Sequence, residues 1–141
     1  VRYAHASEQT IEQMLKVHQY VQACAPSISQ WAALAALTSS QGCVEQMREE
    51  YRRRRDVVLS GLEGLGVRTY PPEGAFYVFP DLSPIGMDGN EAAQKLLDAG
   101  VITVPGSAFG EHGTTHLRIS YAASIENIEK GLSIMQNVLV G

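Results

Sequence analysis

The stretch from Val101 to Ser124 constrains the fold most, because it consists of two short apolar runs joined by a glycine-punctuated loop. The run from Val101 to Val104 is β-branched throughout and is stopped by Pro105-Gly106. The run from His116 to Tyr121 alternates between polar and apolar residues. β-branched composition and strict alternation both favour strands. The sequence therefore predicts one strand on each side of this loop.

The second of these strands carries an arginine. Alternation places Leu117, Ile119 and Tyr121 on one face, and it places Arg118 on the other face beside Ser120. The planar guanidinium of an arginine can grip a carboxylate through two parallel hydrogen bonds, which a lysine cannot match. Spacing alone favours the alternative of a solvated arginine on an outward sheet face, since most arginines are exposed.

Three stretches of the chain resemble one family in the order that the family has them. VPGSAFGEHGTTHLRISYAAS is similar to the C-terminal signature of the class I/II pyridoxal-phosphate-dependent aminotransferases of fold type I, in which a V-P-G-x-x-F-G loop precedes a strand ending R-[IL]-S-[YF]-A. Residues 72–79 resemble the P-x-G-A-F-Y-x-F strand of that family, and residues 24–33 resemble its C-x-[AP]-[PS]-x-x-Q-x-A-A helix start. The resemblance runs through essentially the whole chain.

The resemblance implies an α/β fold, specifically the C-terminal part of a fold type I enzyme whose small domain is a two-layer α+β structure. Residues 1–42 are then the tail of the large cofactor-binding domain, and residues 43–141 are the linking helix and the small domain. In the family the signature arginine, here Arg118, binds the α-carboxylate of the substrate. Phe76 is expected either to line the substrate pocket or to belong to the core.

The implied reaction moves an amino group between an amino acid and a 2-oxo acid, with pyridoxal 5'-phosphate as cofactor and a homodimer as the assembly. The family's catalytic lysine and the residues that hold the cofactor lie in a segment N-terminal to this stretch. Lys16, Lys95 and Lys130 fall within predicted helices and do not match that lysine. We therefore assign no catalytic, cofactor-binding or metal-binding residue here, and we expect the chain alone to be inert.

Other functions share parts of this pattern. A pyridoxal-phosphate-dependent β-elimination lyase uses the same carboxylate-binding arginine. Aminotransferase-like domains fused to winged-helix repressors sense effectors without turnover. A free-standing carboxylate-binding module is a third alternative, against which the apolar helix predicted over residues 27–39 argues, because an apolar helix must be covered on all sides.

Charge and cysteine content narrow the possible partners and compartment. A net charge of -4 and a pI near 5.5 argue against nucleic acid as the main partner. The run Arg52–Arg55 is the one basic cluster, and helical geometry spreads it around the axis beside glutamates. Cys24 and Cys43 are too few for a disulfide framework, so a reducing cytoplasm is expected. No apolar run reaches membrane-spanning length. The start at Val1 instead of methionine indicates a fragment.

Further elements follow from periodicity and from capping and turn residues. Helices are expected from Ser7 to about Ala23, over 43–65, over 90–99 and from Ser124 onward, and strands over 66–70 and 75–79. The spacing of Asp88 and Glu91 indicates a capping box. From Cys43 on, this order predicts helices packed on one face of a mainly antiparallel or mixed sheet.

The spacing of some histidines and glycines resembles that of metal sites and dinucleotide-binding loops, but neither kind of site is expected here. His18 is a lone histidine, and His112 and His116 flank a loop and not a helical turn, so we expect no metal site. The glycines at 61, 64 and 66 end a helix and precede a strand, whereas a dinucleotide-binding loop follows a strand and opens a helix, so they are interpreted as helix termination.

Overall fold

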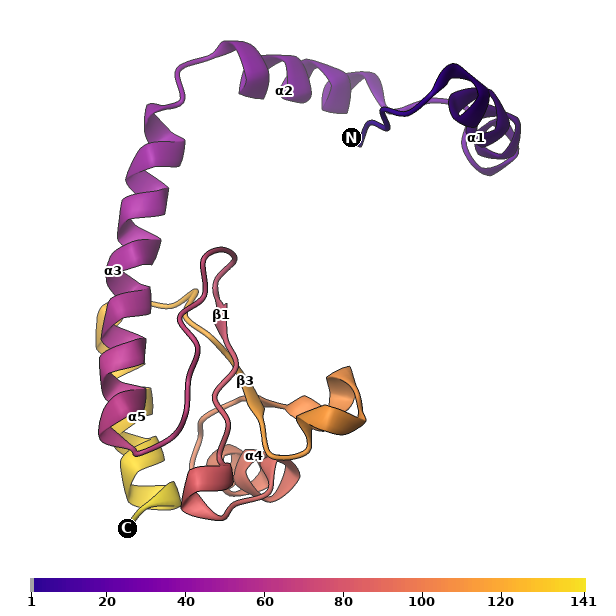
Figure 1. Cartoon of the computed structure of the whole chain (residues 1–141). Coiled ribbons are helices and arrows are strands. Elements are labelled where there is room, and N and C mark those ends of the chain that lie inside the picture. Colours follow the sequence, from indigo (N-terminus) through magenta and orange to yellow (C-terminus); the bar gives the residue numbers. More distant parts are fainter. Residues whose placement is uncertain (1) are drawn as a thin grey trace. The chain divides into compact units, whose positions relative to one another are not determined.

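The computed structural model describes residues 2–141, and the chain divides after Cys43 into two compact units. The first unit contains helices α1 and α2, and the second contains nearly all of α3 and every element that follows it (Figure 1). The assignment of residues 1–42 to a large domain and of 43–141 to a small domain stays a prediction.

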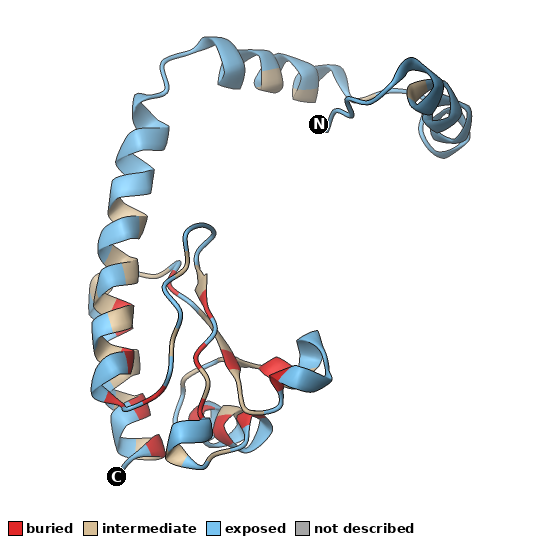
Figure 2. Cartoon of the chain, viewed as in Figure 1, coloured by how far each residue is buried: buried red, intermediate tan, exposed pale blue. Residues whose placement is uncertain are grey.

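The N-terminal unit consists of α1 (Glu8–Val21) and α2 (Ser27–Thr38). Ser7 caps α1 as predicted, because its hydroxyl accepts a hydrogen bond from the Thr10 N–H. Neither helix contains a buried residue. On α2, Ile28 and Trp31 are 81% and 70% exposed, and most of both helices has the colour of exposed residues in Figure 2. An apolar helix with this exposure needs a covering surface that residues 2–43 do not supply.

The C-terminal unit combines three α-helices and three short 3-10 helices with three strands. Its elements are α3 (Gly42–Gly64), β1 (Tyr77–Val78), the 3-10 helix η1 (Ser83–Ile85), α4 (Gly89–Asp98), β2 (Val104–Pro105), the 3-10 helices η2 (Gly106–Phe109) and η3 (Glu111–Gly113), β3 (Leu117–Ser120) and α5 (Ile125–Leu139). The sheet order is β1-β3-β2, and both pairings are antiparallel. The predicted mixed helix-and-sheet architecture is confirmed.

One hydrophobic core joins the sheet to its helices. The centre of the core holds Leu62 of α3, Leu96 of α4 and Leu117 of β3, each with no exposed surface. Helices α3 and α5 run side by side (Figure 1), and the backbone of α3 at Gly61 lies close to the Leu132 side chain of α5. The sheet is therefore backed by helices that fix its position through shared apolar contacts.

All three strands that were predicted outside β3 are shorter than expected. Over 66–70 only Arg68 pairs, in an isolated bridge to Asp81, and Pro71 and Pro72 follow without the N–H groups that a strand would use. The strand predicted over 75–79 is reduced to Tyr77–Val78.

The strand predicted over 101–104 begins only at Val104. The Val101 N–H donates instead to the Leu96 carbonyl, 2.8 Å away, and so closes the end of α4. Ile102 is 83% exposed and therefore gains nothing from sheet burial.

Helix boundaries follow the predicted caps closely. The Asp88 carboxylate accepts hydrogen bonds from the N–H groups of Asn90 and Glu91, and the Ser124 hydroxyl caps α5. The capping box is only half formed, because the Glu91 carboxylate pairs with Lys95 at 2.8 Å and does not reach back to Asp88. An ion pair four residues along the helix competes with the box for the same carboxylate.

The two halves of helix α3 differ in how far their apolar side chains are buried. Its C-terminal half buries Val58 and Leu62, whereas Val44 and Met47 at its start are 56% and 61% exposed. Glutamates and arginines on its outside form three ion pairs, Arg48–Glu45, Arg52–Glu49 and Arg54–Glu50. The apolar side chains of α3 thus enter the core only in the second half of the helix.

Adjacent leucines of α4 provide a test of this core. Leu96 has no exposed surface and Leu97 is 52% exposed. We expect Leu96→Ala to lower the free energy of unfolding by about 2–5 kcal/mol, because it removes buried methyl groups and leaves a cavity. Leu97→Ala makes the same chemical change on the exposed side and should cost less than about 1 kcal/mol. Urea denaturation followed by circular dichroism measures both, and equal losses would contradict the assigned core.

Candidate functional site

Two aromatic rings from opposite sides of β3 flank the guanidinium of Arg118. The Arg118 Cζ lies 4.6 Å from the centre of the Tyr77 ring and 4.7 Å from the centre of the Phe109 ring. Because β3 is the central strand, Tyr77 reaches the arginine from β1 and Phe109 reaches it from η2, directly after β2. Both contacts are of the cation–π kind, in which the ring face attracts the positive charge.

Arg118 keeps its hydrogen-bonding capacity in this arrangement. Within residues 2–141 no acidic side chain pairs with it and no hydrogen bond from its side chain is present, although the residue is only partly exposed. A guanidinium carries five N–H donors in its plane, and contact with an aromatic ring leaves these donors available. The site therefore presents an immobilised cation with free donors, the combination that binds a carboxylate.

The strand pattern predicted around this arginine agrees with the burial. Leu117 and Tyr121 are buried on the core side, and Arg118 and Ser120 project away from it. Arg118 is accordingly placed on the outer face of the sheet, yet it is not a freely solvated arginine, because two rings lie against it. The alternating pattern shows which face Arg118 occupies but not which rings it meets there.

The loop from Gly106 to His116 is closed on itself and tied to α4. The Gly106 N–H donates to the His116 carbonyl at 2.7 Å, and the backbones at Gly106 and Gly113 lie so close that a Cβ atom on either glycine would strike the carbonyl oxygen of the other. The Gly89 N–H at the start of α4 donates to the Thr114 carbonyl, also at 2.7 Å. Only glycine allows the chain to approach itself this closely.

Asp81 connects the end of this loop, at Thr115, to the turn at residues 81–83. Its carboxylate accepts hydrogen bonds from the Ser83 N–H at 2.9 Å, from the Ser83 hydroxyl at 2.7 Å and from the Thr115 hydroxyl at 2.8 Å. Burial raises the pKa of the Asp81 carboxyl, but these hydrogen bonds and the neighbouring His116 lower it more, to about 2. Asp81 is therefore ionised at neutral pH and holds the start of β3 against the turn at residues 81–83.

Phe76, which sequence reasoning associated with the site, lies against α3. Its ring stacks on that of Tyr51 at 6.0 Å and lies 4.5 Å from the ring of Tyr77. Tyr77, not Phe76, contacts the Arg118 guanidinium. Sequence reasoning missed Tyr77 and Phe109, although both lie within the quoted motifs, because a motif gives no distance between its segments. A role for Phe76 in a substrate pocket stays a prediction.

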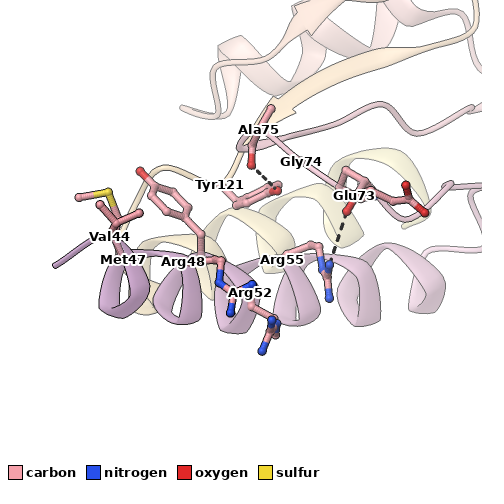
Figure 3. Close-up of a pocket in the computed structure, with 11 residues that line it drawn as sticks. Val44, Met47, Arg48, Arg52, Arg55, Glu73, Gly74, Ala75 and Tyr121 are labelled. Atoms are coloured by element: carbon pink, nitrogen blue, oxygen red, sulfur yellow. Dashed lines mark hydrogen bonds between the residues drawn. The ribbon is translucent and has the colours of Figure 1, made fainter. Parts of the chain in front are cut away.

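A groove of about 470 Å³ lies between the first half of α3 and the turn at residues 72–75 (Figure 3). Val44, Met47 and Tyr51 form its apolar part, and Arg48, Arg52 and Arg55 line its edge. Two hydrogen bonds fix the turn, from the Tyr121 hydroxyl to the Ala75 carbonyl at 3.0 Å and from Arg55 to the Pro72 carbonyl at 3.5 Å. Burial raises the pKa of the Tyr121 phenol, so it stays protonated and donates.

The turn beside this groove contains the one non-glycine residue with a positive φ among residues 2–141, Ala75 at 60°. An alanine in this region costs of order 1 kcal/mol and persists only where its surroundings hold it. The Tyr121 hydroxyl, bound to the Ala75 carbonyl, provides such support. The backbone that leads into Tyr77, and so to the ring beside Arg118, is thereby held in one conformation.

The histidines and other possible metal ligands do not cluster in the part of the chain that the structure describes. No group of three or more histidine, cysteine, aspartate or glutamate side chains is placed to hold a metal ion within residues 2–141. His18 is exposed on α1, and His112 lies in η3, outside any longer helix. No helix over this range combines the length and the apolar character needed to cross a membrane.

Comparison with known proteins gives consistent matches over nearly the whole chain. The family model described as "Aminotransferase class I and II" matches residues 1–134. A "Probable aspartate aminotransferase" of Methanocaldococcus jannaschii is 48% identical over 128 residues, which are 91% of this chain and 34% of that protein. An "Aspartate/prephenate aminotransferase" of Thermus thermophilus is 45% identical over an alignment of 142 positions, which covers 99% of this chain and 36% of that protein.

A solved structure agrees with these matches. The structure of aspartate aminotransferase from Thermus thermophilus with maleate superimposes with a TM-score of 0.85 at 46% identity, covering 93% of this chain and 35% of that one. This chain therefore spans about a third of the length of the proteins that it matches.

The hydrogen bonds around Asp81 predict how the fold responds to acid. A carboxyl whose pKa is lowered in the folded state stabilises the fold above its ordinary pKa, and this contribution is lost as the pH falls from about 4 towards 2. We expect Asp81→Asn to lower the free energy of unfolding at pH 7 by about 2 kcal/mol, with the difference from the parent shrinking as the pH approaches 2. Denaturation at several pH values measures this.

The exposed Asp98, which accepts only a hydrogen bond from Gln94, gives the matched control. Asp98→Asn should change the stability by less than about 0.5 kcal/mol at every pH. A constant difference between Asp81→Asn and the parent from pH 7 to pH 2 would show that the lowered pKa does not contribute to stability.

Proposed function

This chain belongs to the class I and II aminotransferases, and on that basis we propose that the protein containing it moves an amino group from an amino acid to a 2-oxo acid. The observation that carries the proposal is the Arg118 guanidinium, flanked by Tyr77 and Phe109 with its N–H donors unused. In this proposal Arg118 binds the α-carboxylate of the substrate.

Members of this family generally depend on pyridoxal phosphate, and we propose the same cofactor here. When bound, that group withdraws electrons from the bonds at the substrate's α carbon. It requires a lysine for attachment. Lys16 donates to Gln13, Lys95 pairs with Glu91, and Lys130 is exposed on α5. None of these lysines belongs to the cluster around Arg118, so the described residues do not fit the attachment site. The remaining two thirds of a protein of this family's length would have to supply it.

The contribution of Arg118 in this proposal is positional. Two parallel hydrogen bonds to a carboxylate fix both its position and its orientation. Fixing the carboxylate also fixes which bond at the α carbon faces the reacting group, and small errors in such placement lower the rate steeply. The partly covered surroundings strengthen the pairing, because a charge pair that is shielded from water interacts more strongly than an exposed one.

The proposal also covers domain organisation, assembly and compartment. We propose that residues 1–42 end a large cofactor-binding domain and that 43–141 form a linking helix and a small domain, which the two compact units support. The exposed apolar side chains of α2 support burial against other parts of the protein and, in a homodimer, against a second copy. The unpaired thiols of Cys24 and Cys43 support a reducing cytoplasm. Nucleic acid and membrane are not proposed as partners.

The overall activity is tested on the full-length protein with pyridoxal phosphate and a panel of amino acids that includes L-aspartate. An absorption band of bound cofactor that a particular amino acid converts to the amino form, with release of the matching 2-oxo acid, is the expected result. Release of ammonia from the substrate would favour a β-elimination lyase instead. A band that no amino acid converts would favour an effector-sensing domain.

The proposed role of Arg118 is tested with substitutions in that protein. Arg118→Lys keeps the charge and loses the fork, so we expect kcat/KM for the best donor to fall about 10–100-fold. Arg118→Ala removes the charge as well, and we expect a loss of about 100–1,000-fold. Arg53→Ala, on the exposed side of α3, is the matched control and should leave kcat/KM within about twofold. Parental kinetics in Arg118→Ala would exclude the proposed carboxylate clamp.

A further inference from the structure

We propose that Phe109 is a positioning residue that holds the guanidinium of Arg118 in the orientation needed to bind a carboxylate. The inference rests on the proposed function and extends it to a residue to which that function assigns no role. Phe109 reaches the site from the loop between β2 and β3, and its ring centre lies 4.7 Å from the Arg118 Cζ.

Phe109 does not belong to the hydrophobic core of the C-terminal unit. The side chain is 54% exposed, and Phe109 belongs neither to the buried core nor to the partly buried residues packed against it. An apolar ring left half in water gains little from burial in this position. Its ring contacts in the structure are with Arg118 and with the ring of Phe79.

The backbone that carries Phe109 is fixed from three directions. The Gly106 N–H closes the loop onto the His116 carbonyl. The Ser107 hydroxyl donates to the Asn90 side-chain oxygen of α4 at 2.8 Å. The backbones at Gly106 and Gly113 also lie in close contact, so the two arms of the loop pack directly against each other. The loop therefore fixes the backbone from which the Phe109 ring projects.

A second ring supports Phe109 from behind. The Phe79 ring meets it edge to face at 6.0 Å, and the other contact of Phe79 is a stack on His116 at 4.9 Å with an interplanar angle of 21°. His116 directly precedes β3, the strand that carries Arg118. His116 thus contacts Phe79, Phe79 contacts Phe109, and Phe109 contacts Arg118 on β3. Displacement of Phe109 away from Arg118 would also alter its contact with the Phe79 ring.

Phe109 acts on carboxylate binding indirectly, by restricting the side-chain conformations of Arg118. A long arginine side chain samples many rotamers in water, and only some of them point its fork at a bound carboxylate. Rings from both flanks of β3 restrict that sampling and leave the donors in the guanidinium plane unused. Tyr77 alone would leave the side toward η2 open. The restriction is the contribution that we assign to Phe109.

The test uses the full-length protein with its cofactor and the best amino donor from the panel that includes L-aspartate. Phe109→Leu keeps an apolar side chain and removes the ring, so we expect KM to rise about 3–10-fold while kcat stays within about twofold. Phe109→Tyr keeps the ring face and should restore the parental KM. The melting temperature of both variants should match the parent, because the residue lies outside the core. Tyr70→Leu, at a 79% exposed tyrosine, is the control for loss of a surface ring.

The combination of Phe109→Leu with Arg118→Lys separates positioning from independent effects. If Phe109 acts through the fork of Arg118, the double variant should have the same KM as Arg118→Lys alone. Additive increases in KM, or an unchanged KM in Phe109→Leu, would overturn the inference and leave the clamp intact. An unchanged KM in Arg118→Lys, or the absence of any reacting amino acid, would instead overturn the proposed function and this inference with it.

Discussion

The pairing of β3 with a neighbour on each side is the constraint on which the C-terminal unit depends. Because β3 is central, its inner residues reach the core, while its outer face receives side chains from β1 and from the loop after β2. A strand with only one neighbour would leave Arg118 open on the other flank. The same two pairings that complete the small sheet therefore also build the surroundings of the arginine.

The support for this arrangement comes from polar contacts as much as from apolar ones. The strands are only two to four residues long, so the ladder itself contributes few hydrogen bonds. Asp81 joins the turn at 81–83 to Thr115, and Tyr121 joins the sheet to Ala75. Each of these side chains binds a segment distant in sequence, which keeps the short strands in register although local pairing is sparse.

The sequence allowed the helices to be predicted well, for a physical reason that is visible in individual residues. Ser7, Asp88 and Ser124 cap the helices as expected, since a cap is a local interaction between a side chain and the next turn. Strand lengths were overestimated, because pairing depends on which segments meet: Val101 satisfies its N–H on α4. The identity of Arg118 and its face followed from alternation, whereas Phe109 and Tyr77 could be recognised only once distances were known. The family was identified from the resemblance of three sequence motifs, whereas the residue spacing around Arg118 alone favoured a solvated arginine.

The contrast between the two units bears on how pieces of this protein behave in the cell. The unit from Val44 onward has its own core, whereas α2 displays Ile28, Trp31 and Leu37 to solvent. A fragment of this protein that leaves α2 uncovered therefore exposes an apolar surface of the kind that chaperones bind and that self-associates.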